Sequence, residues 1–261
     1  GVRLVGSEMC IRDRVYAADH GIANNSISAF PKSATFLNVL HMLNDKAAVN
    51  QMCMSIGCRL EIVDIGICDG NTQYQKPRNV KTLFWNKGWK QGTNDSSLEP
   101  AMDQGDMEKC FSISTELIQR SKEVKVVVLG EMGIGNSSTS SILQALIQDI
   151  NVKECIGRGS GINDEILAKK LKVCEETVNR VRALYPNGLD VFDICREVGG
   201  FEILAMAGSI IKAAQLHKLI VIDGYMACVS ALIAYRINPH VKPFLVFATK
   251  STELGLSLIH I

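Results

Sequence analysis

A hydrophobic run followed at once by a glycine-rich turn constrains this chain more than any other feature. Residues 124–129 read VKVVVL, a β-branched run typical of a buried strand, and residues 130–138 read GEMGIGNSS. An apolar pattern of helical period follows as far as Ile147. A strand, a glycine turn and a helix in direct succession predict an α/β unit with the turn at the strand's carboxyl end.

The turn has the composition of an anion-binding loop. Gly130, Gly133 and Gly135 let backbone N–H groups approach a ligand closely, and Ser137 or Ser138 is expected to cap the helix. A helix start offers unpaired N–H donors and a partial positive charge, which stabilises an anion by about 0.3–1 kcal/mol. The turn is not a Walker A loop, because no GK[ST] follows, and its glycine spacing differs from GxGxxG.

Glu131 is unusual in such a turn, because a carboxylate beside a bound phosphate would repel it. A side chain that points away from the phosphate could hold a ribose hydroxyl or face a cationic ring. The alternative is a tight turn with a solvated glutamate. The residues alone leave both interpretations open.

Alternating strand and helix patterns predict an α/β fold. Further strands are expected at residues 60–67, 219–222 and 244–247. Helices are expected at residues 35–47 capped by Thr35, at 163–181 capped by Asn163 or Asp164, and at 203–214 after Gly199-Gly200. The alternation indicates a parallel sheet with helices on both faces. Residues 86–106 are polar and glycine-rich, which predicts a long functional loop.

Ligands of open parallel sheets bind where the loops at the carboxyl ends of the strands converge. Four such loops carry unusual chemistry: residues 64–71, 130–138, 223–225 and 249–253. A second glycine-rich segment, residues 157–161, precedes a helix, and Arg158 and Lys169 or Lys170 could reach an anion there. A flexible surface loop explains that segment equally well. His20 is placed at a strand end, and no histidine is expected to bind a metal.

Charge and composition exclude several classes of partner. The formal net charge is +1, from 28 basic and 27 acidic residues, and no basic stripe suggests nucleic acid. The most apolar stretch, residues 219–237, is interrupted by Asp223 and Gly224, so it predicts a core strand and helix and no membrane span. Nine scattered cysteines without CxxC, and no secretory leader, predict reduced thiols in a cytoplasmic protein.

Both ends of the chain read unlike the rest. SEMCIRDR near the start and LSLIHI at the end look like translated sequencing-adapter read-through. Residues 1–14 and 256–261 are therefore expected to be non-native tails, and residues 15–255 to form the α/β core. A genuine disordered tail is the alternative.

Several segments together resemble one family closely. The resemblance runs from about Tyr16 to Gly255 and is to nicotinate-nucleotide:dimethylbenzimidazole phosphoribosyltransferases. The matching segments are ADHG (18–21), ISAFPKSAT (27–35), EIVDIGI (61–67), GTN (92–94) with EPAM (99–102), GEMGIGNSS (130–138), GRGSGINDE (157–165), REVGGFEILAMAGSI (196–210), VIDGY (221–225) and ATKSTE (248–253).

The resemblance implies both a fold and a reaction. The fold is a three-layer, doubly wound, mostly parallel α/β domain beside a small helical domain, which would be incomplete here, in a homodimer. The reaction transfers phosphoribose from nicotinate mononucleotide to 5,6-dimethylbenzimidazole, with inversion at the anomeric carbon. It gives α-ribazole 5′-phosphate, the lower-ligand nucleotide of cobalamin, and nicotinate. No metal or other cofactor is implied.

The matched motifs imply the site residues. Glu131 would lie near the ribose and the departing ring, where positive charge develops. The residues expected around the phosphate and ribose are Gly133, Ile134, Gly135, Asn136, Ser137, Ser138, Lys170 and Ser251. Ser28, Phe30 and Met132 are expected to line the pocket for the base.

The chain departs from the family pattern in two ways. The family's general base, a glutamate in a Gly-Glu-Gly-type turn, lies beyond ATKSTE, so no catalytic base can be assigned in this sequence. Many members also carry a glutamine where this chain has Phe36-Leu37-Asn38, so the preferred base could differ. A non-catalytic nucleotide-binding protein remains an alternative. A dinucleotide-dependent oxidoreductase is a third and weaker one, because the glycine spacing is wrong.

Overall fold

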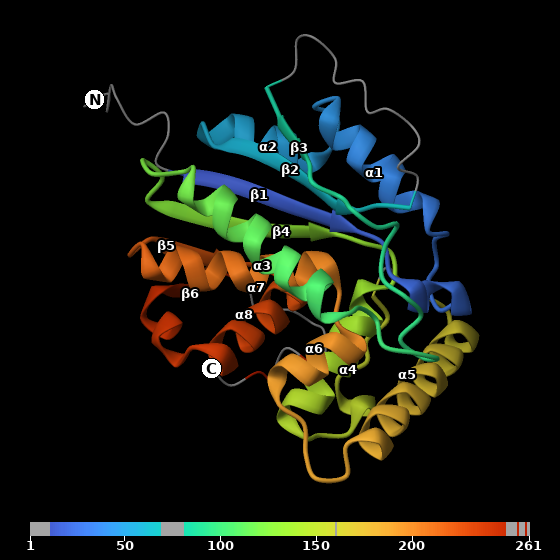
Figure 1. The fold of residues 1–261 in the computed structure, drawn as a ribbon. Coiled ribbons are helices and arrows are strands. Elements are labelled where there is room, and N and C mark those ends of the chain that lie inside the picture. The colour runs from blue at the N-terminus through green and yellow to red at the C-terminus, as the bar shows by residue number, and fades with distance from the viewer. Residues whose placement is uncertain (1–10, 69–80, 160, 249–254, 256–258, 260–261) are drawn as a thin grey trace.

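The computed structural model describes residues 11–68, 81–159, 161–248, 255 and 259. They contain a sheet of six strands in the order β3-β2-β1-β4-β5-β6, in which every neighbouring pair is parallel (Figure 1). The strands are β1 Ile11–Ala18, β2 Arg59–Gly66, β3 Leu83–Asn86, β4 Val126–Met132, β5 Leu219–Ile222 and β6 Leu245–Phe247. The strand order reverses between β1 and β4, which is the doubly wound arrangement, so the expected α/β class is confirmed.

Four of the strands coincide closely with the apolar runs of the sequence. β2, β4, β5 and β6 are those strands, whereas β3 is a short, partly buried edge strand without a clear pattern. β1 includes residues 11–14, which belong to the segment expected to be a non-native tail. Residues 12–14 pair with both β2 and β4, and Ile11 pairs with β4. Their origin stays a prediction.

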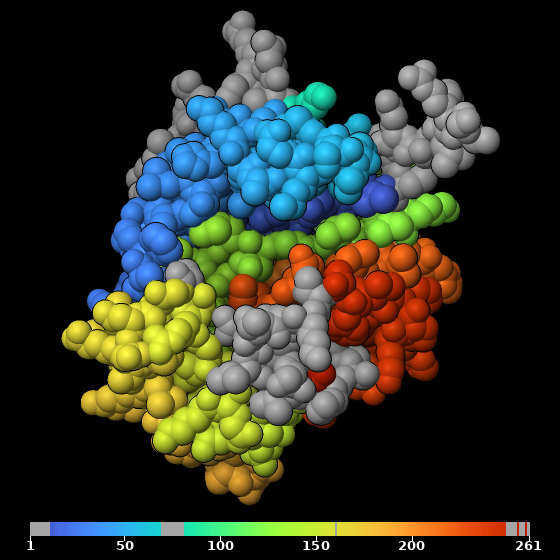
Figure 2. Space-filling view, turned by 180° about the vertical axis from the view of Figure 1, so that it is seen from behind, coloured from blue at the N-terminus to red at the C-terminus, as the bar shows by residue number. Residues whose placement is uncertain are grey.

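Helices cover both faces of the sheet. α1 Ser33–Leu43 and α2 Ala48–Ile56 pack on one face, and α3 Gln104–Gln119, α7 Phe201–Gln215 and α8 Tyr225–Ile237 form the layer on the other (Figure 1). α4 Asn136–Gln148, α5 Asp164–Leu184 and α6 Val191–Val198 pack on one another and beside α8. Figure 2 shows these layers from behind, with α1 and α2 in blue above the sheet and later helices in yellow to red below it.

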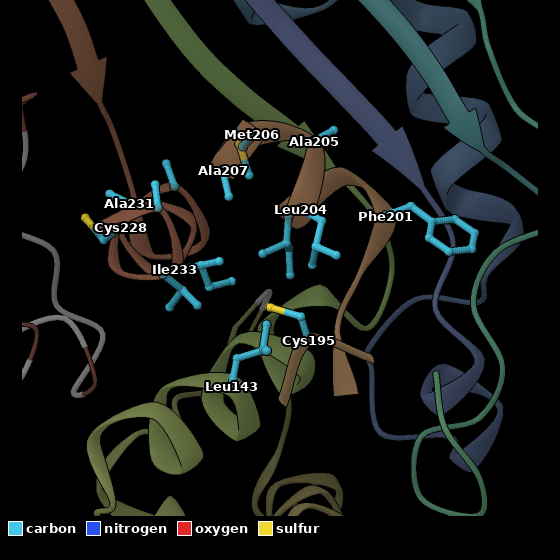
Figure 3. Close-up of a cluster of buried hydrophobic side chains, with 14 of the residues drawn as sticks. Leu143, Cys195, Phe201, Leu204, Ala205, Met206, Ala207, Cys228, Ala231 and Ile233 are labelled. Carbon is cyan, nitrogen blue, oxygen red and sulfur yellow. The ribbon is translucent and has the colours of Figure 1, made fainter. Parts of the chain in front are cut away.

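The largest part of the core surrounds α7. Phe201, Leu204 and Met206 are fully buried there, and the side chains of Leu143 in α4 and Ile233 in α8 point toward Leu204 (Figure 3). A helix that is apolar on nearly all sides is buried on all sides. Gly208 brings α3 close, because a Cβ at that position would lie 2.3 Å from Oγ of Ser114.

The helix starts confirm one expected cap and correct another. Asn163 caps α5 as expected, since its side chain accepts a hydrogen bond from the N–H of Ile166. Thr35 is not a cap, because α1 begins at Ser33 and Thr35 is buried in its first turn. The single helix expected at residues 35–47 ends earlier. The chain turns at residues 44–47, so α1 ends at Leu43 and α2 begins at Ala48.

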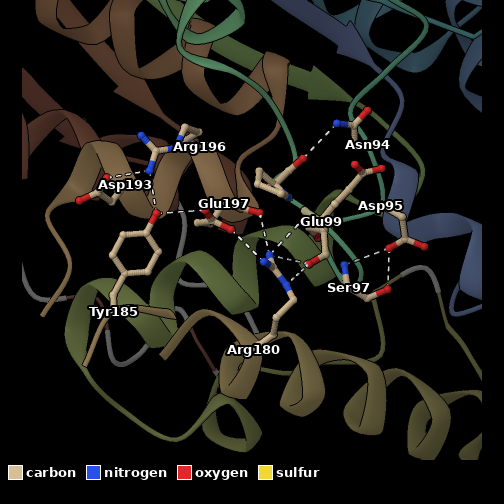
Figure 4. Close-up of polar contacts among 11 residues, drawn as sticks. Asn94, Asp95, Ser97, Glu99, Arg180, Tyr185, Asp193, Arg196 and Glu197 are labelled. Atoms are coloured by element: carbon tan, nitrogen blue, oxygen red, sulfur yellow. Dashed lines mark hydrogen bonds and ion pairs between the residues drawn. The ribbon is translucent and has the colours of Figure 1, made fainter. Parts of the chain in front are cut away.

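The long loop is confirmed between β3 and α3, and it is held at both of its sides. The guanidinium of Arg180 in α5 donates to the carbonyl oxygens of Ser96 and Glu99 and to the carboxylate of Glu197 in α6 (Figure 4). On the other side the N–H of Thr93 donates to the carbonyl oxygen of Asp19, just past β1. The loop therefore braces the end of β1 against α5 and α6.

Two findings bear on the expectations from composition. The described stretch from Leu219 to Ile237 forms β5 and α8, and no described helix is long and apolar enough to cross a membrane. The eight cysteines within the described residues are all free thiols, six of them buried.

Candidate active site

The candidate site lies where β1 and β4 end, at the point where the strand order reverses. Ala17 of β1 pairs with Met132 at the end of β4. One residue further on, a Cβ at Gly133 would lie only 2.4 Å from the carbonyl oxygen of Ala18. Glycine is therefore required where the chain leaves β4.

The turn that follows is shaped by Gly135, and this corrects the expected cap. Gly135 has φ +101 and is the N-cap residue of α4, so Ser137 and Ser138 lie inside the first turn and do not cap it. Thr35 supports the turn from α1, because its hydroxyl accepts a hydrogen bond from the N–H of Ile134 at 3.1 Å.

The start of α4 carries backbone donors that are available to a ligand. The N–H groups of Asn136 and Ser138 bond to the carbonyl oxygens of Gly133 and Gly135. The N–H groups of Gly135 and Ser137 have no acceptor among the described residues. A helix start with such free donors and a partial positive charge suits a phosphate or carboxylate.

A cavity of about 410 Å³ opens at this helix start. That volume is typical of small-molecule sites. The residues that line it come from separate parts of the chain: Ser28, Glu131, Met132, Gly133, Ile134, Gly135, Asn136, Ser137, Gly159, Tyr225 and Met226.

Lys170 brings a buried positive charge to this cavity wall. Its side chain comes from α5, and its Nζ lies 3.1 Å from Oγ of Ser137 and 3.1 Å from the carbonyl oxygen of Gly157. A Cβ on Gly159 would lie 3.1 Å from the same Ser137 oxygen and 3.8 Å from Nζ. The second glycine-rich segment therefore packs against the first, and Lys170 lies where both meet.

Glu131 also lines the cavity. The sequence left open whether its side chain faces a ligand or is solvated, and its contacts bear on that choice. Its carboxylate accepts a hydrogen bond from the side-chain amide of Asn136. Burial raises its pKa from 4.5 to about 7, and repulsion from Glu202 adds to the rise, while Asn136 and His20 oppose it. Glu131 is therefore held against the helix start and is not a freely solvated turn residue.

Most of the other predicted residues that the structure describes lie at the cavity, but Phe30 and Ser138 do not. Ser28 and Met132 line it. Phe30 is 52% exposed and absent from the lining, and Ser138 is buried away from it. Ser251 lies outside the described residues, so its expected role stays a prediction.

Three lining residues were not assigned to the site individually: Gly159, Tyr225 and Met226. Gly159 belongs to the second glycine-rich segment, and Tyr225 belongs to the loop at residues 223–225 that was expected to converge on the site. Tyr225 and Met226 open α8, whose N-cap residue is Gly224 at φ +81. The Asp-Gly turn after an apolar strand was the available signal, yet Asp223 itself is exposed and is not part of the lining. Of the loops expected to converge, that of Asp64 lines a different cavity, with Asn86 and Trp89.

No metal centre is formed by the described residues, among which no three His, Cys, Asp or Glu side chains come together. The glycine turn also follows β4, whereas the dinucleotide fingerprint follows the first strand of its fold. That placement argues against the oxidoreductase alternative.

A doubly wound α/β domain with a helix start suited to an anion and a carboxylate at its switch point is typical of proteins that handle nucleotides. Residues 11–260 match the family described as phosphoribosyltransferase, and the chain belongs to that family. The resemblance drawn from the motifs is thereby confirmed.

Two similar proteins carry the same name. The nicotinate-nucleotide–dimethylbenzimidazole phosphoribosyltransferase of Shewanella sp. (strain W3-18-1) is 37% identical over 243 residues, covering 92% of this chain and 67% of the relative. The protein of the same name from Roseiflexus castenholzii is 37% identical, covering 92% of this chain and 66% of the relative. The chain thus spans about two thirds of their length.

A solved structure agrees in fold. The crystal structure of CobT from Thermus thermophilus matches with a TM-score of 0.84 at 27% identity, over 95% of this chain and 72% of that one. This likeness is independent support for the doubly wound fold.

Gly133 and Gly130 provide a matched test of the turn. We expect Gly133→Ala to destabilise the protein by about 1–3 kcal/mol, because the methyl group would overlap a backbone oxygen that cannot move freely. A Cβ at Gly130 meets only a methyl group of Val15 at 3.3 Å, so Gly130→Ala should cost less. Urea denaturation measures both, and equal losses would contradict this account of the turn.

The raised pKa of Glu131 predicts a pH-dependent effect on stability. Because its pKa in the folded state, about 7, is above its ordinary 4.5, its contribution to stability is present below pH 4.5 and is lost as the pH rises through 7. We expect Glu131→Gln to gain stability relative to the native chain between about pH 5 and about pH 8. Urea denaturation at both pH values measures the difference, and a constant difference would show that the carboxylate titrates normally.

Proposed function

We propose that this protein transfers phosphoribose from nicotinate mononucleotide to 5,6-dimethylbenzimidazole or a related base. The products are α-ribazole 5′-phosphate and nicotinate. The family membership and the shared name of the relatives support this reaction. We further propose that the protein acts as a homodimer in the cytoplasm.

One observation carries the proposal: a single cavity combines an anion site, a carboxylate and apolar walls. The free N–H groups of Gly135 and Ser137, with Lys170 beside them, suit the 5′-phosphate. Met132 and Met226 offer polarisable apolar surface to a flat aromatic ring. A mononucleotide needs these features together and within reach of one another.

The position of Glu131 suits the chemistry of the ribose. The nicotinate ring of the substrate is a positively charged pyridinium, and it leaves as a neutral pyridine. Strong acid catalysis of its departure is therefore unnecessary. The anomeric carbon becomes oxocarbenium-like as the ring departs, and an ionised Glu131 would stabilise that charge. The phosphate contacts contribute by holding the ribose in place for the incoming base.

We assign no general base to a residue of this sequence. Removing the proton from the incoming base typically accelerates such a reaction by about 10²–10⁴-fold. Glu131 lies against the helix start, where we place it beside the ribose. The second candidate is a protein that binds nicotinate mononucleotide without turning it over.

Lys170 and its neighbour Lys169 provide a matched pair for testing the phosphate site. Lys170 is buried beside Ser137, whereas Lys169 is exposed on the same helix. Loss of a charged hydrogen bond of about 1.5–3 kcal/mol predicts that Lys170→Met weakens binding of nicotinate mononucleotide about 10–100-fold. Lys169→Met should leave binding unchanged. Calorimetry measures both affinities.

The activity itself is tested by nicotinate release from nicotinate mononucleotide and dimethylbenzimidazole, using the full-length gene product. Release that requires both substrates supports the transferase, whereas binding without release with any benzimidazole supports the second candidate. Nicotinate riboside, which lacks the phosphate, is the control for the lysine variants. If Lys170→Met weakened riboside binding as much as nucleotide binding, the phosphate assignment would be wrong.

A further inference from the structure

A buried ion pair lies directly beneath the glycine turn. Nε2 of His20 is 2.7 Å from Oε1 of Glu202, and neither side chain is exposed. Nδ1 of His20 is 3.0 Å from the hydroxyl of Thr139 in α4. The pair therefore connects the end of β1, the start of α7 and the start of α4.

Two glycines are packed against this pair. A Cβ at Gly133 would lie 3.2 Å from Nε2 of His20 and 3.3 Å from Oε1 of Glu202. A Cβ at Gly200 would lie 2.4 Å from Cε1 of His20. Because Gly133 also lines the cavity, only the backbone of the turn separates the ion pair from the cavity.

The surroundings of His20 favour its charged form. Glu202 lies in the first turn of α7, where the N–H groups of the helix stabilise a carboxylate. Burial alone would lower the pKa of His20, but attraction to Glu202, Asp19 and Glu131 outweighs it, so its pKa is raised. Cys110 of α3 also faces the pair, since Glu202 contributes to the raised pKa of its thiol after burial.

The two charges act on Glu131 in opposite directions. After burial, repulsion from Glu202 is the next cause of the raised pKa of Glu131, and attraction to His20 opposes it. Oε2 of Glu202 has no hydrogen-bond partner among the described residues. No donor there offsets the negative charge that Glu202 presents to Glu131. Removing either partner would therefore change the ionisation of Glu131 in a defined direction.

We infer that His20 and Glu202 are positioning residues that hold the glycine turn in place and set the charge of Glu131 at the cavity. Neither side chain lines the cavity, so they act through the turn and through Glu131. A cationic pyridinium binds better to an ionised Glu131, so the pair would also set the pH range of nucleotide binding. That last step rests on the proposed function, whereas the effect on Glu131 does not.

The inference is tested by titrating the carboxyl carbon of Glu131 by ¹³C NMR in protein labelled at glutamate, with Glu131→Gln to assign the signal. In Glu202→Gln the titration midpoint should fall by roughly one pH unit, because a repelling charge is lost. In His20→Gln it should rise, because an attracting charge is lost. Opposite shifts distinguish an electrostatic role from simple distortion of the fold.

Glu197→Gln is the matched control, because Glu197 is also a buried, ion-paired glutamate but bonds to Arg180 away from the cavity. It should leave the midpoint of Glu131 unchanged. Unchanged midpoints in both test variants, or shifts in the same direction, would overturn the inference. If His20→Gln does not fold, the fall in Glu202→Gln, set against the control, still decides the matter.

The link to binding is measured separately, as the pH dependence of the affinity for nicotinate mononucleotide in the same variants. The midpoint of this dependence should follow that of Glu131. Shifts of Glu131 without any binding would contradict the proposed function and leave the positioning role standing.

Discussion

The carboxyl ends of β1 and β4 lie so close together that only glycine fits between them. A Cβ at Gly133 would come within 2.4 Å of the carbonyl oxygen of Ala18. The chain must turn at this point, and Gly135, in the left-handed region, completes the turn and begins α4. The N–H groups at the helix start, two of which have no acceptor among the described residues, and the cavity beside them follow from this contact between two strands at the switch point of the sheet.

The charged side chains around the glycine turn lie on different sides of it. Lys170 contacts the first turn of α4 from the side, where a phosphate would bind. His20 and Glu202 lie beneath the turn, and Glu131 lies at the cavity between these groups. Positive charge therefore faces the proposed anion site, while negative charge faces the place of a cationic ring. This separation would allow a carboxylate to follow a glycine turn that we propose binds phosphate, without opposing it.

Local patterns predicted the parts of the fold and site that depend on neighbouring residues. The strand before Gly130 and the cap at Asn163 follow from hydrophobic period and capping. The packing of the second glycine-rich segment against the first was left open by the residues, and Lys170 was singled out only by the resemblance to the family. The roles of Thr35, Tyr225 and Met226 did not follow, because they depend on which elements meet in space. The ion pair of His20 and Glu202 joins residues 182 positions apart, so no local pattern reports it. Ser137 and Ser138 were wrongly expected to be caps, because Gly135 alone tolerates the required backbone conformation.

The most direct test of the central claim follows the backbone amides of Gly135 and Ser137 by ¹⁵N NMR while nicotinate mononucleotide is added. If the phosphate binds at the start of α4, these two signals should shift strongly with the nucleotide and much less with nicotinate riboside at equal saturation. Signals that stay in place when the nucleotide binds, or that shift equally with the riboside, would contradict the account.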